Sequence, residues 1–351
     1  MAQSFLTIIF GRVITGVCVG IICSTVPGYV ANIVIPDKRG FLGTCFQLLC
    51  SLGALFAAYF GTIFSWNELS LISIIPVIIS SIGMYFAPES PIHLIQCKQS
   101  KQALQSLERL RTKESDIVIE LIELEDRILL NNQQLQTNMD GKSSPISFLR
   151  RPDVYHPMVI AIMLQFFQQF SGINAIMFYL VSIFQDSGVN IDPQLASIIV
   201  NFALFISCLF SGIFMNYLGH RLWLFISSIG MSMTMLMMAL YYYFQSSNDQ
   251  TSCIPLICLI IFSISFACGF GPIPWMIIGE ITPIEAMGMV GSFSATTNWL
   301  CAFIITKEFD DFIHFLGKQG VYLLFACCSF LSIIFVWIFV PETQKRNELI
   351  N

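Results

Sequence analysis

The sequence is dominated by apolar runs that are each about as long as a bilayer is thick. Nine such runs occur, at residues 5–31, 41–64, 69–87, 154–184, 195–217, 221–244, 254–279, 287–306 and 319–340. A run of roughly 20 apolar residues spans the hydrocarbon core of a membrane as a helix. Lipid accepts only helices or closed barrels, and these runs are too long and too uniformly apolar for barrel strands. The sequence therefore predicts an all-α membrane protein with nine transmembrane helices.

The composition excludes several other classes of protein. The 351 residues are 55% hydrophobic and 11% charged, whereas a soluble domain carries about a quarter charged residues. The net charge is −5, and no basic tract indicates a nucleic-acid partner. Most of the twelve cysteines lie within apolar runs, and none shows the spacing of a metal site. Since HExxH and GxSxG are also missing, we expect no catalytic residue, no metal and no cofactor.

A polar insert, residues 92–152, separates the third apolar run from the fourth. Within it, leucine and isoleucine recur every three or four residues among charges, which is typical of amphipathic helices in water. Fourteen of the seventeen Lys and Arg fall in this insert, in residues 35–40 and 218–221, and in the tail 341–351. Because Lys and Arg concentrate in cytoplasmic loops, we expect the insert to be a cytoplasmic helical linker and the tail to be cytoplasmic.

Two short segments recur at nearly the same spacing. YVANIVIPDKRG, residues 29–40, is similar to IIGEITPIEAMG, residues 277–288, and PESP at 88–91 is similar to PETQ at 341–344. The offsets of 248 and 253 residues indicate two related halves in parallel orientation. These are expected to be residues 1–91, with three helices, and residues 153–340, with six. Symmetry then predicts three further helices before Met1.

The motifs of this chain resemble those of the sugar porters of the major facilitator superfamily, most closely the facilitative glucose transporters. In family order they are GR (11–12), PGYVANIVIPDKRG (27–40), LGTCFQLLCSLG (42–53), PESP, QQFSGINA (168–175), GPIPW (271–275), GEITP (279–283) and VPET (340–343). The resemblance covers essentially the whole chain. It implies the helical bundle of that superfamily, with nine transmembrane helices present of an expected twelve.

The resemblance also implies a function. A chain of this kind is expected to be a facilitative hexose transporter in the plasma membrane that works by alternating access, in a truncated form. Its partners would be a monosaccharide, D-glucose, and the surrounding lipid bilayer. The alternative is a non-transporting relative or fragment that acts as a sensor or regulatory partner. Proton coupling and the formation of homo-oligomers stay open at this point.

Uncharged amides lie where the family binds sugar. An amide offers both a donor and an acceptor, which a buried sugar hydroxyl requires. By resemblance the hexose-binding residues are Gln47, Gln168, Gln169, Asn174, Asn201 and Asn298, with Trp275 as an apolar platform under the pyranose ring. The alternative interpretation is that such amides join helices by hydrogen bonds, and Gln165 is expected to have that packing role. Gly172 offers a break that turns Asn174 inward.

A gate and a charge network are implied as well. Gly271, Pro272 and Pro274 interrupt the seventh apolar run, which predicts a bend that opens and closes the cavity; a static kink is the alternative. The cytoplasmic charge network is expected to comprise Arg39, Glu89, Arg221, Glu280 and Glu342.

Some positions depart from the pattern of the family. His220 and Met287 stand where the cytoplasmic network usually has arginine, so we expect a weaker or rewired latch. Ala267 and Ala302 replace an acidic residue and an asparagine of the glucose carriers. These two replacements leave the identity of the sugar open.

Overall fold

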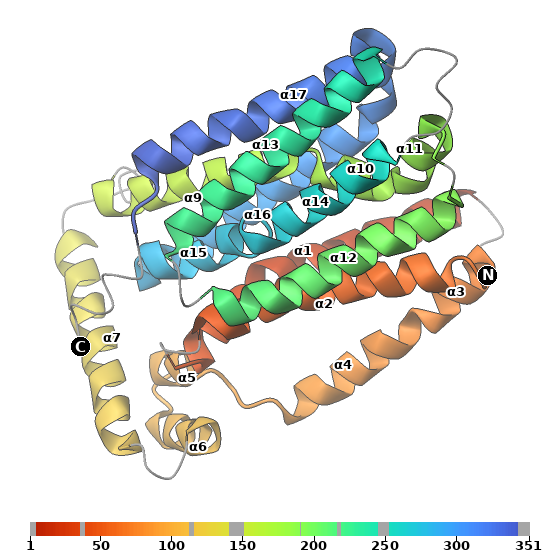
Figure 1. The fold of residues 1–351 in the computed structure, drawn as a ribbon. Helices are drawn as coiled ribbons and strands as arrows, with labels where there is room; N and C mark the ends of the chain where they lie inside the picture. Colours follow the sequence, from red (N-terminus) through yellow and green to blue (C-terminus); the bar gives the residue numbers. More distant parts are fainter. Residues whose placement is uncertain are drawn as a thin grey trace.

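The computed structural model describes residues 5–35, 39–111, 116–139, 151–189, 191–215, 219–244 and 253–342. In the first part of the chain the helices are α1 (Phe5–Ile33), α2 (Arg39–Phe60), α3 (Trp66–Ile72) and α4 (Ile74–Phe86), followed by α5 (Pro91–Gln96), α6 (Ser100–Leu110) and α7 (Ile117–Met139). The second part contains α9 (Pro152–Phe170), α10 (Ile173–Phe178), α11 (Leu180–Ser187), α12 (Pro193–Phe214), α13 (His220–Phe244), α14 (Ile254–Cys268), α15 (Ile273–Ile281), α16 (Ile284–Lys307) and α17 (Phe309–Phe339). Figure 1 shows the long helices lying side by side as a bundle, with α7 crossing one end of it.

The predicted spans are confirmed. Within the described ranges, nine helical segments are long and apolar enough to cross a membrane. The last of them begins at Phe309, ten residues before the predicted start at 319. The reason is Gly317, whose φ of 72° interrupts α17 and lets a short first helix precede the apolar one. A positive φ costs glycine little because it has no Cβ atom.

The second half is tightly packed. Its core contains fully buried aromatic rings from several helices, namely Phe184, Phe262, Phe270, Phe309 and Phe325. Small residues allow the helix backbones to approach, as they commonly do in membranes, where packing rather than water exclusion drives helix association. Gly230 on α13 is one case, since a Cβ atom there would collide with Ser265 on α14. The second half therefore has the more extensively buried core among the described residues.

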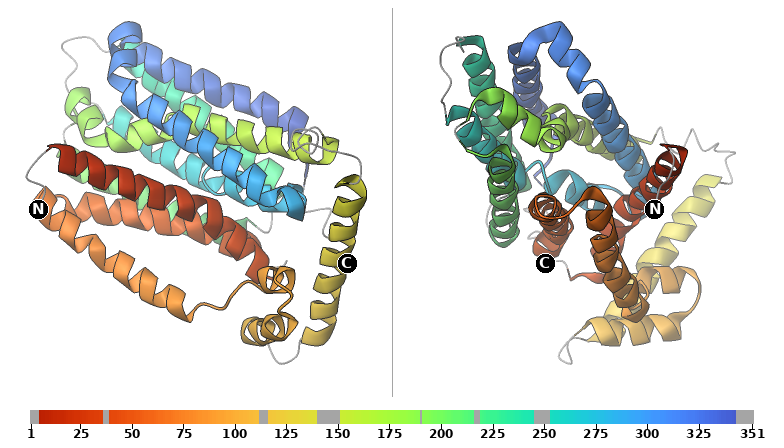
Figure 2. Two further views of the ribbon diagram at one scale, coloured as in Figure 1. Left: turned by 180° about the vertical axis from the view of Figure 1, so that it is seen from behind. Right: turned by 90° about the vertical axis from the view of Figure 1, so that its right-hand side faces the viewer.

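The first half meets the second through α1 and α2. Helix α1 packs against α15 and α16, and α2 packs against α12 and α15. Helix α4, by contrast, carries no buried residue, and it stands apart from the other long helices in Figure 1 and in the left view of Figure 2. The contacts between the halves thus come from α1 and α2.

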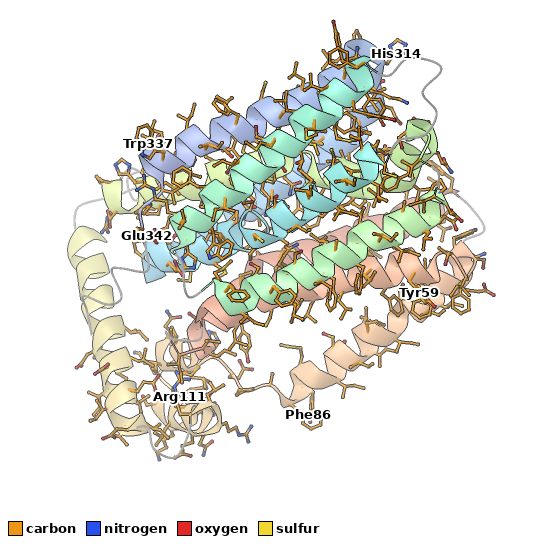
Figure 3. The ribbon with its side chains drawn as sticks, in the orientation of Figure 1. Tyr59, Phe86, Arg111, His314, Trp337 and Glu342 are labelled. Carbon is orange, nitrogen blue, oxygen red and sulfur yellow. The ribbon has the colours of Figure 1, made fainter. Side chains whose placement is uncertain are left out.

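The polar insert forms its own small unit at one end of the bundle. Leu94, Ala103 and Ile128 join α5, α6 and α7 in a compact apolar core. Arg111, labelled among these helices in Figure 3, donates to both carboxylate oxygens of Glu120, with Nη2 2.6 Å from Oε1 and Nε 2.8 Å from Oε2. Its Nη1 donates to the carbonyl oxygen of Ile33, 2.9 Å away. This guanidinium therefore ties the insert to the last residue of α1.

Candidate functional site

The fourth span is broken where the sequence predicts it. Helix α9 ends at Phe170, and Gly172 has a left-handed backbone with φ 88° before α10 begins. A Cβ atom at Gly172 would collide with the ring of Phe325. Glycine is required here both by the φ angle and by the space. The break turns the chain so that Asn174 on α10 faces back toward α9.

Four amides on α9, α10 and α16 form a continuous hydrogen-bonded chain next to this break. Asn174 Nδ2 donates to Gln169 Oε1 at 2.6 Å, and Gln169 Nε2 lies 3.5 Å from Gln168 Oε1. Asn298 Nδ2 donates to the same Gln168 oxygen at 2.6 Å. Gln168, Gln169 and Asn298 are buried. We call Gln168, Gln169, Asn174 and Asn298 the amide cluster.

Gln165 also belongs to this neighbourhood. Its side chain is fully buried, and its Oε1 accepts a hydrogen bond from Asn298 Nδ2 at 2.7 Å. Its Nε2 is buried without a hydrogen-bond partner. Such an orphaned donor is costly unless a water or a ligand satisfies it. The hydrogen bond to Asn298 agrees with the packing role expected from the sequence. In addition, the Nε2 group of Gln165 is a donor that a bound molecule near the cluster could use.

Gln168 reaches from α9 to a second helix break. The seventh span is interrupted between Cys268, where α14 ends, and Ile273, where α15 begins. Gln168 Nε2 lies 2.5 Å from the carbonyl oxygen of Phe270 and 3.1 Å from that of Gly271. The amide cluster is thus joined directly to the expected gate residues.

The other predicted binding residues lie at different distances from the cluster. Gln47 on α2 packs over the same break, since its Cγ would be 3.4 Å from a Cβ atom at Gly271. Asn201 on α12 is buried, but its Nδ2 donates to the carbonyl oxygen of Ser197 on its own helix, at 2.9 Å. The structure brings Gln47 from the first half to the break that Gln168 contacts, and it gives the Asn201 amide nitrogen a partner on its own helix.

Trp275 faces a cavity between the two halves. The cavity lies between α1 and α2 on one side and α15 and α16 on the other, and its lining includes Phe46, Trp275, Met276 and Glu280. The rings of Phe46 and Trp275 are tilted by 59° with centroids 6.0 Å apart. This aromatic pair joins the two halves beside the break that Gln168 contacts.

One pair within the expected charge network involves His220, a residue that departs from the family pattern in the sequence. His220 Nδ1 lies 3.2 Å from Glu280 Oε2, and the His220 side chain is 6% exposed. Arg221 donates instead to the backbone carbonyl of Trp337. Figure 3 shows Trp337 and Glu342 at the same end of α17. His220 is the first residue of α13, and Glu280 lies on α15. The position of His220 at the cytoplasmic network of the family was the sequence signal that could have suggested this pairing.

The remaining network residues have different surroundings. The backbone carbonyl of Glu89 accepts a hydrogen bond from Ser106 Oγ at 2.6 Å, which fastens α6 to the segment before α5. Arg39 opens α2, but its side chain lies outside the described part of the structure. Among the residues that are described, no group of three His, Cys, Asp or Glu side chains could hold a metal ion.

The amide cluster offers hydrogen bonds without charge, and it lies beside an aromatic surface. The amide cluster and Gln165 carry donors and acceptors that are all neutral. They lie among helices that are long enough to span a membrane, beside two helix breaks and an aromatic-lined cavity. Broken backbone at membrane depth is tolerated only when it is buried in protein or lines a cavity. The arrangement can bind a neutral, hydroxyl-rich molecule without covalent chemistry.

Comparison with known proteins agrees with this description. The family described as sugar (and other) transporter matches residues 1–348. The facilitated trehalose transporter Tret1 of Apis mellifera ligustica is 36% identical over 349 residues, which cover 99% of this chain and 68% of that protein. Tret1 of Drosophila pseudoobscura pseudoobscura is 34% identical over 343 residues, or 97% of this chain. The chain spans only 39% of that longer relative.

Solved structures show the same fold. The major facilitator superfamily proton:xylose symporter XylE, bound to 6-bromo-6-deoxy-D-glucose, matches with a TM-score of 0.74 and 21% identity over 92% of this chain and 70% of its own. The fucose:proton symporter FucP of E. coli matches with a TM-score of 0.56 over 92% of this chain and 74% of its own. The chain therefore belongs to the sugar (and other) transporter family, whose members are carriers and not enzymes, and it has the fold of the major facilitator superfamily.

Proposed function

We propose that the protein is part of a facilitative sugar carrier that binds its substrate at the amide cluster and moves it by alternating access. The observation that carries this proposal is the convergence of neutral amides from α9, α10 and α16 at a helix break that Gln47 from the other half also contacts. A buried sugar hydroxyl needs a partner for both its hydrogen and its oxygen. Amides that already exchange hydrogen bonds with one another can exchange them with hydroxyls at little net cost.

The substrate is proposed to present a glucopyranosyl unit. The resemblance of the motifs implies D-glucose, whereas the relatives named above are facilitated trehalose transporters. Trehalose consists of two glucose units, so both sugars offer the same ring to the cluster. Trp275, with Phe46 beside it, supplies the apolar surface that the C–H face of such a ring requires.

The expected gate residues and the charge network also have proposed roles in alternating access. Gly271, Pro272 and Pro274 form the bend at which α15 moves. His220 and Glu280, with Arg221, Glu342 and the remaining charges at that end, form the cytoplasmic latch. The proposed location is the plasma membrane, with the insert and the C-terminus in the cytoplasm.

A non-transporting role as a sensor or regulatory partner is the second candidate. It is supported by the extent to which the amides already satisfy one another, which is also what structural hydrogen bonding between helices would produce. A sensor would bind sugar but would not release it on the other side of the membrane. Binding and uptake must therefore be measured separately.

The experiment compares uptake of labelled D-glucose and labelled trehalose into proteoliposomes with binding of the same sugars in detergent. Asn298→Ala removes the donor shared by Gln165 and Gln168, and it is expected to weaken sugar binding by about 1–3 kcal/mol. Thr297→Ala is the matched control, since its hydroxyl only bonds the carbonyl oxygen of Phe293 on its own helix. Equal binding by both variants would contradict the proposed site. Binding without saturable uptake would favour the sensor.

A further inference from the structure

The break between α14 and α15 leaves a backbone carbonyl without its helical donor. In a continuous helix the carbonyl oxygen of Phe270 would accept the N–H of residue 274. Residue 274 is proline, which has no N–H. Gln168 Nε2 supplies the missing donor at 2.5 Å, and it also lies 3.1 Å from the carbonyl oxygen of Gly271. A side chain of α9 thus stabilises the backbone of the break.

A second side chain, that of Ser227, forms a hydrogen bond with the backbone of Phe270. The Phe270 N–H donates to Ser227 Oγ on α13 at 3.1 Å. Ser227 is fully buried, and it can reach the break because Gly269 has no side chain. A Cβ atom at Gly269 would be 2.6 Å from the Ser227 Cβ atom. Both polar groups of Phe270 are therefore satisfied from outside their own helix, the carbonyl by Gln168 and the N–H by Ser227.

We propose that Gln168 and Ser227 form a bracket that holds the break in its present bend, and that Ser227 is a positioning residue for the movement of α15. Gln168 is shared between two tasks. Its Nε2 serves the two carbonyls of the break, while its Oε1 serves Asn298. A sugar hydroxyl that takes the Gln168 amide must displace one of these bonds.

This sharing gives the bracket a role in transport, and to that extent the inference rests on the proposed function. When sugar occupies the amide cluster, the hydrogen bonds from Gln168 to the break weaken. The hydrogen bond between Phe270 N–H and Ser227 then remains to stabilise the bend. Within the described part of the chain, no hydrogen bond joins Ser227 to a member of the amide cluster. Removal of the Ser227 hydroxyl should therefore change how fast α15 moves and not how tightly sugar binds.

The test uses Ser227→Ala in the full chain, reconstituted in nanodiscs. Hydrogen–deuterium exchange of the amides of Phe270, Gly271 and Ile273 is expected to be about five- to tenfold faster than in the parent protein, as loss of one buried hydrogen bond predicts. Ser228→Ala is the matched control. Its hydroxyl is equally buried, but it bonds Leu224 on its own helix and Ser332 on α17, so exchange at the break should not change.

A second variant tests the bracket by adding a hydrogen bond at the break, whereas Ser227→Ala removes one. Pro274→Ala restores the N–H of residue 274 as a donor to the carbonyl oxygen of Phe270, and exchange at the same three amides is expected to slow. In uptake assays Ser227→Ala should alter the maximal rate at least threefold while the half-saturation concentration stays within twofold. If exchange at the break is the same in Ser227→Ala and Ser228→Ala, or is unchanged by Pro274→Ala, the bracket is refuted. Altered exchange in a protein that takes up no sugar would refute the proposed function and leave the bracket standing.

Discussion

Gly43 on α2 lies directly against Met276 on α15. A Cβ atom at Gly43 would be 2.9 Å from the Met276 Cγ atom and 3.1 Å from its sulfur. These residues belong to different halves of the chain, and both line the cavity that contains Trp275. The closeness of α2 and α15 therefore depends on the absence of a side chain at residue 43.

Gly43→Leu should push α2 and α15 apart. Overpacking of this kind typically costs about 1–3 kcal/mol, which a thermal unfolding assay in detergent will detect as a lower midpoint. Gly53→Leu on the same helix is the control, because a Cβ atom placed at Gly53 would meet no neighbouring atom within 4 Å. Adding Met276→Ala to Gly43→Leu makes room and should restore most of the loss. If the unfolding midpoint of the double variant is as low as that of Gly43→Leu alone, residues 43 and 276 are not coupled.

Gly172→Ala should destabilise the second half. The substitution places a side chain on a backbone with φ 88° and drives it into Phe325, and a residue held in such a conformation costs about 1–3 kcal/mol. Gly288→Ala provides the comparison, since residue 288 lies inside α16 with open space around it. There alanine should be neutral or slightly stabilising. Similar unfolding midpoints for the two variants would contradict the account of the break.

Arg111→Gln should release the insert from α1. The Arg111 side chain is 7% exposed and its partner Glu120 is 32% exposed, so the expected loss of about 1–3 kcal/mol lies below that of a fully buried pair. Limited proteolysis should then cut within α6 or α7 at lower protease concentrations. Arg109→Gln, at an exposed position in the last turn of α6, should leave the digestion pattern unchanged. If both variants resist proteolysis like the parent, the guanidinium does not hold the insert.

The proposed orientation can be tested by chemical labelling. In a background without exposed cysteines, Asn67→Cys should react with a membrane-impermeant maleimide in intact cells, because the loop near α3 is expected to be outside. Lys98→Cys, in the insert, should react only after the membrane has been permeabilised. Labelling of Lys98→Cys in intact cells would show that the insert is outside the cell and would contradict the proposed orientation.

The sequence predicts the membrane helices well because their length is set by the bilayer and not by their neighbours. The break at Gly172 could also be predicted, since discontinuous helices are typical of the binding sites of transporters. The start of the last span could not. Phe309 is apolar and helical, but whether the chain bends at Gly317 depends on φ, which the residue type alone does not fix.

The candidate site is harder to predict for a related reason. Gln165 is one helical turn from Gln168 and Gln169, and only the position of Asn298 on α16 decides which of them share its donor. His220 has the same limitation, because its partner Glu280 lies 60 residues away in the sequence. A resemblance indicates which residue types to consider. The hydrogen bonds between helices are decided by packing.

The bond from Arg111 to Ile33 has a consequence for how the protein is made. The two residues are 78 positions apart, so the ribosome completes α1 long before it adds the guanidinium that caps the end of that helix. Until then the carbonyl groups of the last turn must rely on water or lipid headgroups. The final placement of α1 is thus completed by a segment outside the predicted membrane spans, which implies that folding of the protein waits for α6 and α7.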